Sequence, residues 1–183
     1  KNKEPNYSFI KDVSSEAFMP FSYGGGIKNL FQAEKILNSG CEKLIINNSF
    51  LKNSDLARTL IKEFGSSTVV CCVDIKKNFF GTYKIFSHVK KRIISESFDE
   101  YLVRCADIGF GEVIIQSVDN DGMRNGYDLN LVERARKYLS CQLVSLGGAG
   151  QISDLKKIIK VGADAAAAGS FFSFHGKYKA VLI

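Results

Sequence analysis

Short apolar runs recur along this chain at intervals that few folds can accommodate. Six runs begin near positions 20, 43, 69, 112, 142 and 164, so successive starts are spaced fairly evenly, except that the third interval is much longer. Each run has the length and near-continuous hydrophobicity of a strand that is buried on both faces. The intervals leave room for a helix between strands, which indicates repeated strand-helix units in a parallel sheet.

Helical periodicity fills most of these intervals. Apolar residues spaced three to four apart precede Gly40 in one interval and Gly162 in another, and a glycine directly after such a pattern is typical of a helix C-terminus. The longest interval contains residues 80–87, which predict an additional hairpin after the third strand.

The fold class that follows is α/β, a (β/α)₈ TIM barrel. Such a barrel needs eight strands and typically about 250 residues, whereas this chain has six units in 183 residues. We therefore expect residues 1–183 to form a single partial barrel domain that lacks the first two strands and is also short at its C-terminus. A doubly wound open sheet is the alternative, but its G-x-G-x-x-G fingerprint is absent from the first turn.

Composition narrows the possible partners and compartment. No run of about 20 apolar residues and no signal-like apolar segment is present, which argues against a membrane span or secretion. The five cysteines include no CxxC pair, so reduced thiols in a cytoplasmic protein fit better than disulfides or zinc. The net charge of +6 favours anionic ligands. Residues 90–92 are an isolated basic tip without interleaved aromatics and do not indicate nucleic-acid binding.

An internal repeat points to the type of ligand. Residues 24–27 align with residues 147–150 at a shift of 123, and the helix and strand that follow also align after one deletion. In both copies the second strand ends in a small polar pair, Asn47-Asn48 or Gly169-Ser170. Backbone N–H groups of a glycine turn can converge on an oxyanion. Two such turns predict two phosphate sites that face each other across the mouth of the barrel, although a lone glycine pair would indicate only a tight turn.

Ionisable residues lie between the two glycine turns. Asp74 ends an apolar strand, where barrel active-site groups project into the mouth. Residues 117–122 are rich in carboxylates, and either an active-site loop or an Asx-rich surface turn would have this composition. Lys76 and Lys77 are candidates for phosphate contacts or for solvated loop charges. His88 and His175 have no nucleophile or metal-ligand partner at a recognisable spacing, so no metal site or organic cofactor is expected.

A set of motifs resembles the cyclase subunit of imidazole glycerol phosphate synthase. The match runs from about residue 18 to residue 175, in order and with suitable spacing. The motifs are Tyr23-Gly-Gly-Gly-Ile27, Ile45-Ile-Asn47, Phe64-Gly-Ser66, Val73-Asp-Ile-Lys76, Ser117-Val-Asp-Asn-Asp-Gly122 with Gly126-Tyr-Asp128, and Gly147-Gly-Ala-Gly150 with Gly162-Ala-Asp164.

The resemblance implies a lyase of histidine biosynthesis. Members of this family take ammonia from a glutaminase partner, with which they form a heterodimer. They convert a bisphosphorylated ribulosyl aminoimidazole-carboxamide nucleotide into imidazole glycerol phosphate and an aminoimidazole-carboxamide ribotide. Such a substrate matches the duplicated phosphate sites that the repeat predicts.

Site residues carry over by position. Asp74 is expected to be the catalytic general acid, whereas the general base of the family belongs on the first strand and has no counterpart here. The expected phosphate ligands are Gly26, Asn47 and Asn48 on one side, and Asp121, Gly122, Gly148, Gly169 and Ser170 on the other. At the opposite face, Lys43 and Glu112 resemble half of a charged ring at the ammonia entrance, and Glu42 matches a glutaminase contact; each could also be an ordinary charge at a strand start.

Some positions depart from the cyclase pattern and favour an alternative. Gln116 and Asn48 replace the usual threonines, and Leu146 replaces a serine. Three other stretches look more like a paralogous branch that supplies ammonia for acetamidino modification of bacterial surface sugars, as in lipopolysaccharide: Asp119-Asn-Asp-Gly-Met123, Phe174-His-Gly176 and Ala180-Val-Leu-Ile183. An inactive, incomplete gene product is a third possibility.

Overall fold

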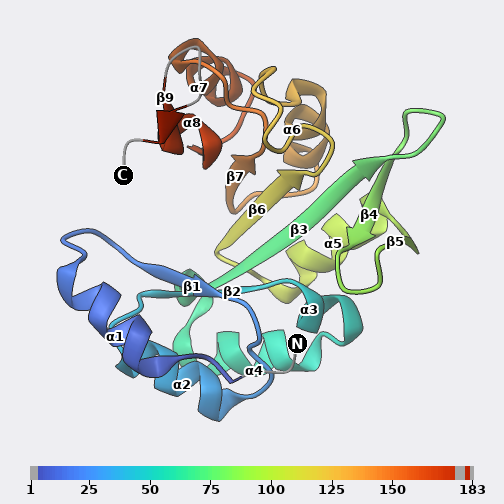
Figure 1. The fold of residues 1–183 in the computed structure, drawn as a ribbon. Coiled ribbons are helices and arrows are strands. Elements are labelled where there is room, and N and C mark those ends of the chain that lie inside the picture. Colours follow the sequence, from blue (N-terminus) through green and yellow to red (C-terminus); the bar gives the residue numbers. More distant parts are fainter. Residues whose placement is uncertain (1–3, 176–179, 182–183) are drawn as a thin grey trace. The chain divides into compact units, whose positions relative to one another are not determined.

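The computed structural model describes residues 4–175 and 180–181, and it divides into two compact units (Figure 1). The first unit comprises residues 1–72 and 107–112, and the second comprises residues 73–106 and 113–183. Gly176 and residues 182–183, which belong to two of the motifs that point to the paralogous branch, lie outside the described residues. Within the described part of the chain, none of the helices has the length and hydrophobicity that a membrane span requires.

Eight strands form the main sheet. Six of them follow the order β1-β2-β3-β6-β7-β8, and β4 and β5 extend from β3 as a hairpin. The pairings between β1 and β2, β2 and β3, and β7 and β8 are parallel. The six are β1 (Ser22–Gly24), β2 (Lys43–Ile46), β3 (Val69–Lys77), β6 (Glu112–Ser117), β7 (Gln142–Leu146) and β8 (Ala165–Ala167). All six predicted strands are therefore confirmed.

The strand order separates the two candidate fold classes. A doubly wound sheet reverses its order at a switch point, as in 3-2-1-4-5-6. Here each parallel strand lies next to the parallel strand that precedes it in the chain, which is the winding of a (β/α)₈ barrel. The sheet is therefore consistent with a TIM-type barrel, and the absence of its first two strands stays a prediction.

Helices connect the parallel strands, as the sequence periodicity predicts. In α2 the side chain of Asn29 accepts a hydrogen bond from the backbone N–H of Gln32 and so begins the helix. Gly40 and Gly162, with φ of +99° and +114°, lie just after α2 and α7 in the conformation that favours glycine. The helices are α1 (Tyr7–Glu16), α2 (Leu30–Asn38), α3 (Asn48–Lys52), α4 (Asp55–Phe64), α5 (Phe98–Ile108), α6 (Leu129–Arg136), α7 (Ile152–Lys160) and α8 (Ser170–Ser173), with a 3₁₀ turn, η1, at Ser66–Thr68.

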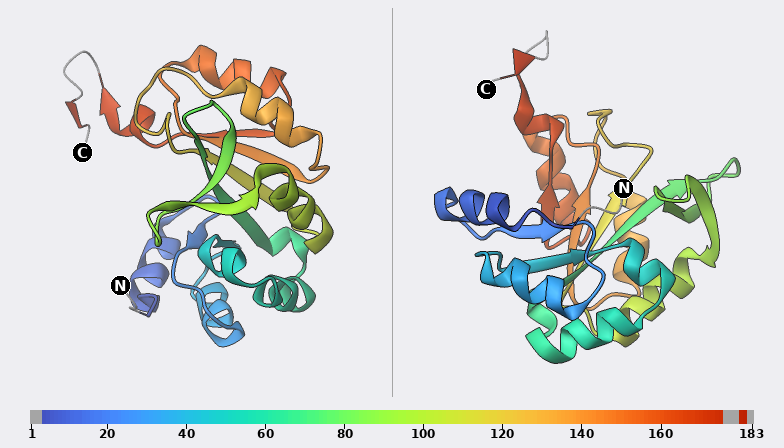
Figure 2. Two further views of the ribbon diagram at one scale, coloured as in Figure 1. Left: turned by 90° about the vertical axis from the view of Figure 1, so that its right-hand side faces the viewer. Right: turned by 60° about the horizontal axis from the view of Figure 1, so that its bottom comes forward.

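The predicted extra hairpin is present and larger than residues 80–87. Figure 2 shows β3 continuing into the lighter green strands β4 (Tyr83–Ser87) and β5 (Arg92–Ser97). Ile75 pairs with Ile85 in antiparallel register, and both side chains are fully buried. The hairpin thereby holds the C-terminal end of β3, where Asp74 lies. A separate two-stranded sheet joins β9 (Phe174–His175) to β10 (Ala180–Val181).

Each unit has an apolar core between strands and helices. The core of the first unit includes Ile36, Leu44, Phe50, Leu60 and Val69, all with no more than 1% of their surface exposed. The core of the second unit includes Ile75, Ile85, Leu102, Ile115 and Leu143, which are equally buried. In the first unit the rings of Phe50 and Phe110 meet edge to face with centroids 5.0 Å apart.

Candidate functional site

The two aligned glycine turns have closely similar backbones. After β1, Gly25 and Gly26 have φ values of +115° and +75°, and after β7, Gly147 and Gly148 have values of +100° and +110°. Residues with a Cβ rarely adopt such values. A pair of glycines with positive φ thus recurs in both copies, but Gly25 and Gly26 correspond to Gly147 and Gly148, a shift of 122 and not the 123 of the sequence alignment.

Strand register places each glycine turn beside the polar pair that follows the next strand. Gly24 pairs with Ile45 and Leu146 pairs with Ala167, so the partners have the same separation along the chain in both copies. Continuing this register past the strand ends brings Gly26 beside Asn47 and Gly148 beside Gly169. Within each unit, the structure thus brings the predicted phosphate ligands to the same edge of the sheet.

Each polar pair begins a short helix. Asn47 and Gly169 are the residues before α3 and α8, and Asn48 and Ser170 are the first residues of those helices. Backbone N–H groups at a helix start have no intrahelical acceptor. Both copies therefore place the first turn of a short helix next to the glycine turn.

A second pair of equivalent residues escaped the sequence analysis. The third residue of α2, Gln32, accepts a hydrogen bond from the backbone N–H of Lys28 at 2.9 Å, and the third residue of α7, Asp154, accepts one from that of Gly150 at 3.1 Å. Both side chains are buried, with 3% and 6% exposed. A side chain at the third helical position that caps the preceding backbone is a recognisable sequence signal. Because this residue is Gln in the first copy and Asp in the second, the alignment of the two copies did not reveal it.

Asp74 lies on β3 with its side chain only 6% exposed. The carbonyl oxygen of the next residue, Ile75, accepts a hydrogen bond from Val118 N–H, which joins β3 to the segment after β6. His88 Nε2 lies 3.8 Å from the Asp74 carboxylate. The β3-β4 hairpin thus folds His88 back against the predicted acid, a contact that the sequence analysis did not anticipate.

The carboxylates of the 117–128 segment are divided between two roles. Asp119 accepts a hydrogen bond from the Lys77 backbone N–H at 2.8 Å, and Asp121 accepts one from the Gln116 amide at 3.1 Å. Gly122, with φ of +74°, has open space where a Cβ would be. Asp119 therefore anchors the segment to β3, while Asp121 and Gly122 lie at its exposed turn.

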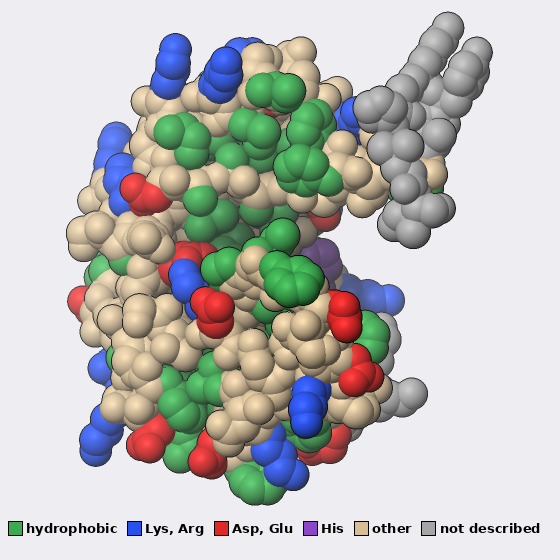
Figure 3. Space-filling model, turned by 90° about the vertical axis from the view of Figure 1, so that its left-hand side faces the viewer, with side chains coloured by type: hydrophobic (Ala, Val, Ile, Leu, Met, Phe, Trp, Pro, Cys, Tyr) green, Lys and Arg blue, Asp and Glu red, His purple; other side chains and the backbone are tan. Residues whose placement is uncertain are grey.

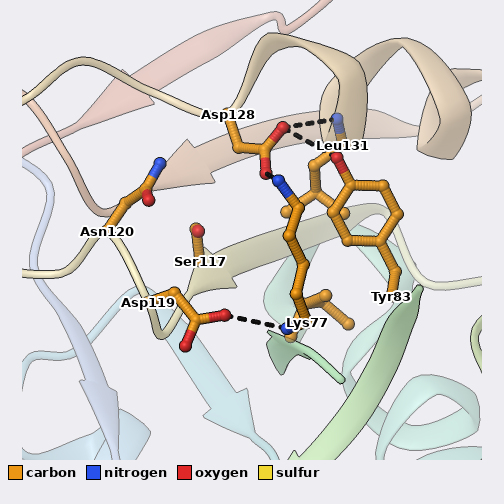
Figure 4. Close-up of a pocket in the computed structure, with 8 residues that line it drawn as sticks. Lys77, Tyr83, Ser117, Asp119, Asn120, Asp128 and Leu131 are labelled. Atoms are coloured by element: carbon orange, nitrogen blue, oxygen red, sulfur yellow. Dashed lines mark hydrogen bonds and ion pairs between the residues drawn. The ribbon is translucent and has the colours of Figure 1, made fainter. Parts of the chain in front are cut away.

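Asp128 is the centre of a polar cluster that Figure 4 shows in close-up. Its carboxylate accepts hydrogen bonds from the Tyr83 hydroxyl at 2.8 Å and from the backbone N–H of Leu131 at 3.1 Å, and it lies 2.7 Å from Lys77 Nζ. Burial, and then the bond to Asp128, raise the pKa of the Tyr83 phenol. Lys77 is thus an ion-pair partner of Asp128, and not one of the unpaired loop charges that the sequence also allowed.

The cavity lined by this cluster has a volume of about 20 Å³. That volume holds about one water molecule and is far too small for a ribotide. The cluster therefore ties the β3-β4 hairpin to the start of α6.

Lys43 and Glu112, the predicted ammonia-entrance residues, form an ion pair at 2.5 Å. They begin β2 and β6, the two neighbours of β3 in the sheet. Their side chains are 32% and 15% exposed. Glu42 is exposed, and its backbone N–H donates to Phe21 O at 2.8 Å. The structure thus brings Lys43 and Glu112 together.

Other predicted features concern cysteines, metals and surface charge. All five cysteines are free thiols. Among the described residues there is no cluster of three or more His, Cys, Asp or Glu that could hold a metal ion. On the face drawn in Figure 3, basic side chains alternate with acidic and hydrophobic ones. That face has the mixed surface of an ordinary globular protein.

Comparison with known proteins identifies the family. The sequence profile of the histidine biosynthesis protein family matches residues 1–179. A protein of Pseudomonas aeruginosa named "Putative imidazole glycerol phosphate synthase subunit hisF2" is 42% identical over 183 residues, which cover all of this chain and 73% of that protein. The chain belongs to the histidine biosynthesis protein family. The resemblance found in the sequence motifs is thereby confirmed.

Other members of the histidine biosynthesis family match over similar lengths. The "Imidazole glycerol phosphate synthase subunit HisF" of Dictyoglomus turgidum is 36% identical over 165 residues, covering 90% of this chain and 66% of that protein. A protein of Vibrio vulnificus named "Putative imidazole glycerol phosphate synthase subunit hisF3" is 38% identical over 185 residues, covering 98% of this chain and 70% of that protein. These relatives support a cyclase-type lyase as the general function.

Proposed function

We propose that this protein is the cyclase of an imidazole glycerol phosphate synthase. Its substrate is a bisphosphorylated ribulosyl aminoimidazole-carboxamide nucleotide, which reacts with ammonia to give imidazole glycerol phosphate and an aminoimidazole-carboxamide ribotide. The observation that carries the proposal is the duplicated strand-turn-helix-strand unit, with equal register and an equivalent glycine backbone in both copies. A substrate with a phosphate at each end requires two such sites.

The phosphate ligands divide between the two copies. Gly26, Asn47 and Asn48 bind one phosphate through backbone N–H groups and side-chain amides. Gly148, Gly169 and Ser170 bind the other, together with Gly122 and Asp121. Glycine lets an anion approach the backbone closely, because no side chain blocks the N–H groups.

Asp74 is the general acid in this proposal. Its side chain is 6% exposed and therefore largely shielded from bulk water. A carboxyl group held against the reacting substrate can deliver a proton to it. The position on β3, after a fully buried run, provides both the burial and the orientation toward the C-terminal ends of the strands.

Substitution of Asp74 tests the proposal. In the full-length protein supplied with free ammonia, Asp74→Asn should lower kcat on the order of 10³-fold and change the Kd of the bisphosphate by less than about threefold, because the amide keeps the shape but cannot donate the proton. Asp107→Asn, at an exposed position on α5, is the matched control and should leave both unchanged. An unchanged kcat for Asp74→Asn would contradict the assignment.

A glutaminase subunit supplies the ammonia in a heterodimer. Glu42 contacts this partner, and the Lys43–Glu112 pair lines the ammonia entrance. Glu42→Lys should weaken the complex by at least tenfold, measured by titration calorimetry with the purified glutaminase. Turnover with free ammonia should be unaffected, because Glu42 lies at the start of β2, away from the glycine turn.

The second candidate function is ammonia delivery for acetamidino modification of a surface-polysaccharide sugar. The observation that favours it is the replacement of the usual cyclase threonine by Gln116 at the end of β6, where its amide donates to Asp121 at 3.1 Å. Complementation separates the two functions. Only the cyclase should restore growth without histidine to a strain that lacks its own cyclase, and failure of the full-length gene to do so would favour ammonia delivery.

A further inference from the structure

The β3-β4 hairpin places an imidazole beside the proposed acid. Ile75 pairs with Ile85 and Lys76 with Lys84 in antiparallel register, so Asp74 lies opposite Phe86. Side chains at alternate positions on a strand share a face. His88 lies in the turn directly after β4, two positions beyond Phe86, and this turn brings its imidazole close to the Asp74 carboxylate.

The two side chains differ sharply in their access to water. The Asp74 side chain is 6% exposed, the His88 side chain is 57% exposed, and His88 Nε2 lies 3.8 Å from Asp74 Oδ2. The edge of the imidazole meets the Phe86 ring, with centroids 5.0 Å apart and the planes at 85°. The imidazole thus spans from a buried carboxyl to solvent, and an aromatic neighbour limits its rotation.

Other titratable groups on this face contact different partners. Lys76 Nζ lies over the Phe86 ring, 5.5 Å from its centroid, and Lys84 is the register partner of Lys76. Arg92 on β5 pairs with Ser87, which points to the opposite face of β4 from His88. Among these groups, His88 is the one that the structure places against the Asp74 carboxylate.

We propose that His88 is a proton relay that reloads Asp74 after each turnover. This inference rests on the proposed role of Asp74 as the general acid. Once the Asp74 carboxyl has given its proton to the substrate, the imidazolium N–H of His88 transfers a proton to the resulting carboxylate. Asp74 is then a neutral carboxyl again, and the neutral imidazole takes a proton from solvent. Across the gap between the two side chains, the transfer proceeds through one water molecule or after a small side-chain rotation.

A relay solves a problem that burial creates. Burial separates Asp74 from bulk water, so reprotonation of its carboxylate needs a path. An imidazole has two ring nitrogens, so it can give a proton from one and take a proton at the other. His88 acts on the reaction only through Asp74.

Chemical rescue tests the relay. In the full-length protein supplied with free ammonia, His88→Ala should lower kcat by about 10- to 100-fold with little change in KM. Added imidazole should restore at least half of the lost rate in a concentration-dependent manner, because it supplies the missing proton donor. Lys90→Ala, on the same exposed turn, is the control and should change neither constant.

Two results would overturn the relay. The first is a His88→Ala rate equal to that of the wild type, and the second is a lowered rate that neither imidazole nor buffer acids of similar strength restore. The second would show that His88 only supports the hairpin. A merely structural role would also leave the shape of the pH–rate profile unchanged, whereas loss of the relay should remove one of its limbs.

A separate measurement distinguishes failure of the relay from failure of the cyclase proposal. If the wild-type protein does not turn over the bisphosphate, the cyclase proposal is wrong, and the pairing is judged by NMR alone. At fixed pH, Asp74→Asn should shift the imidazole resonances of His88, whereas Asp107→Asn should not. Unshifted resonances would show that the two side chains do not interact, and the inference would be wrong.

Discussion

The two copies of the strand-turn-helix-strand unit use glycine for different reasons. In the first copy, a Cβ on Gly25 would meet no atom within 4 Å. In the second copy, a Cβ on Gly148 would lie 2.2 Å from Gly126 O, and the Gly126 N–H donates to Gly148 O at 2.8 Å. Gly25 is therefore required by its backbone conformation. Gly148 is required by its backbone conformation and also because another backbone segment packs against it.

The helix caps of the two copies differ in a related way. Gln32 has a side-chain N–H to donate as well as an oxygen that accepts, and it donates to Glu4 at 2.7 Å, which ties the first copy to residues before α1. Asp154 can only accept, and it takes hydrogen bonds from the backbone N–H groups of Gly150 and Gln151, both at 3.1 Å. The same cap position therefore fastens the first copy to an outside segment and the second copy to its own turn.

Gly148→Ala should have the largest effect on this comparison. The new Cβ would overlap the carbonyl of Gly126, and the φ of +110° would also strain an alanine. Backbone cannot move aside cheaply, so we expect the free energy of unfolding to fall by about 4 kcal/mol, measured by urea denaturation.

Gly25→Ala is the comparison variant in the first copy, at a glycine with a φ similar to that of Gly148. Its φ of +115° is equally unfavourable for alanine, but the space beside it is open. We expect a loss of about 1 to 2 kcal/mol. Equal losses for the two variants would contradict the conclusion that packing distinguishes the second turn.

The caps provide the next largest effect. Asp154→Ala leaves the backbone N–H groups of Gly150 and Gln151 without their acceptor and empties a buried position, so we expect a loss of about 2 kcal/mol. Gln32→Ala removes the acceptor of one backbone N–H, that of Lys28, and should lower the free energy of unfolding by about 1 kcal/mol. Thermal unfolding of both variants checks the order, and a larger loss for Gln32→Ala would reverse the comparison.

Sequence patterns predicted the parts of this fold that depend on local periodicity. The six strands, the helices before Gly40 and Gly162, and the repeat all follow from apolar spacing and glycine positions, which short-range sterics determine. The strand order could be anticipated as well, because the spacing fits one strand-helix unit after another.

The parts that the sequence did not reveal depend on contacts between distant residues. The Asp74–His88 contact depends on the register of the β3-β4 hairpin and on the turn after β4, in which His88 lies. The bond from Tyr83 to Asp128 spans 45 residues and joins two elements whose packing no local pattern specifies. The alternation of side chains along residues 83–87, paired with β3 in antiparallel register, was the sequence signal that could have predicted that His88 lies near Asp74.

The smallest expected effect concerns the acidic residue that begins the second strand in each copy. Asp164 N–H donates to Leu143 O at 2.8 Å, as Glu42 N–H does to Phe21 O. Among the residues that the structure describes, the carboxylate is bound in the second copy alone: it accepts from Leu143 N–H at 2.8 Å and pairs with Arg136. The backbone bond from Leu143, and then Arg136, lower the pKa of Asp164.

This lowered pKa makes the second copy sensitive to acid. A carboxyl group with a depressed folded-state pKa stabilises the protein above its unfolded pKa of about 4, and that contribution is lost as the pH falls through the folded value. Because the side chain is 52% exposed, solvent screening limits the contribution to about 1 kcal/mol or less. The stability advantage of wild type over Asp164→Asn should therefore be full near pH 6 and shrink between about pH 5 and pH 2.

Glu42→Gln is the control, because Glu42 is exposed and directly precedes the equivalent strand. In urea unfolding at each pH, its free energy of unfolding should follow that of the wild type. A constant gap for Asp164→Asn would mean that its charge contributes nothing, and that the two strand starts differ only in shape.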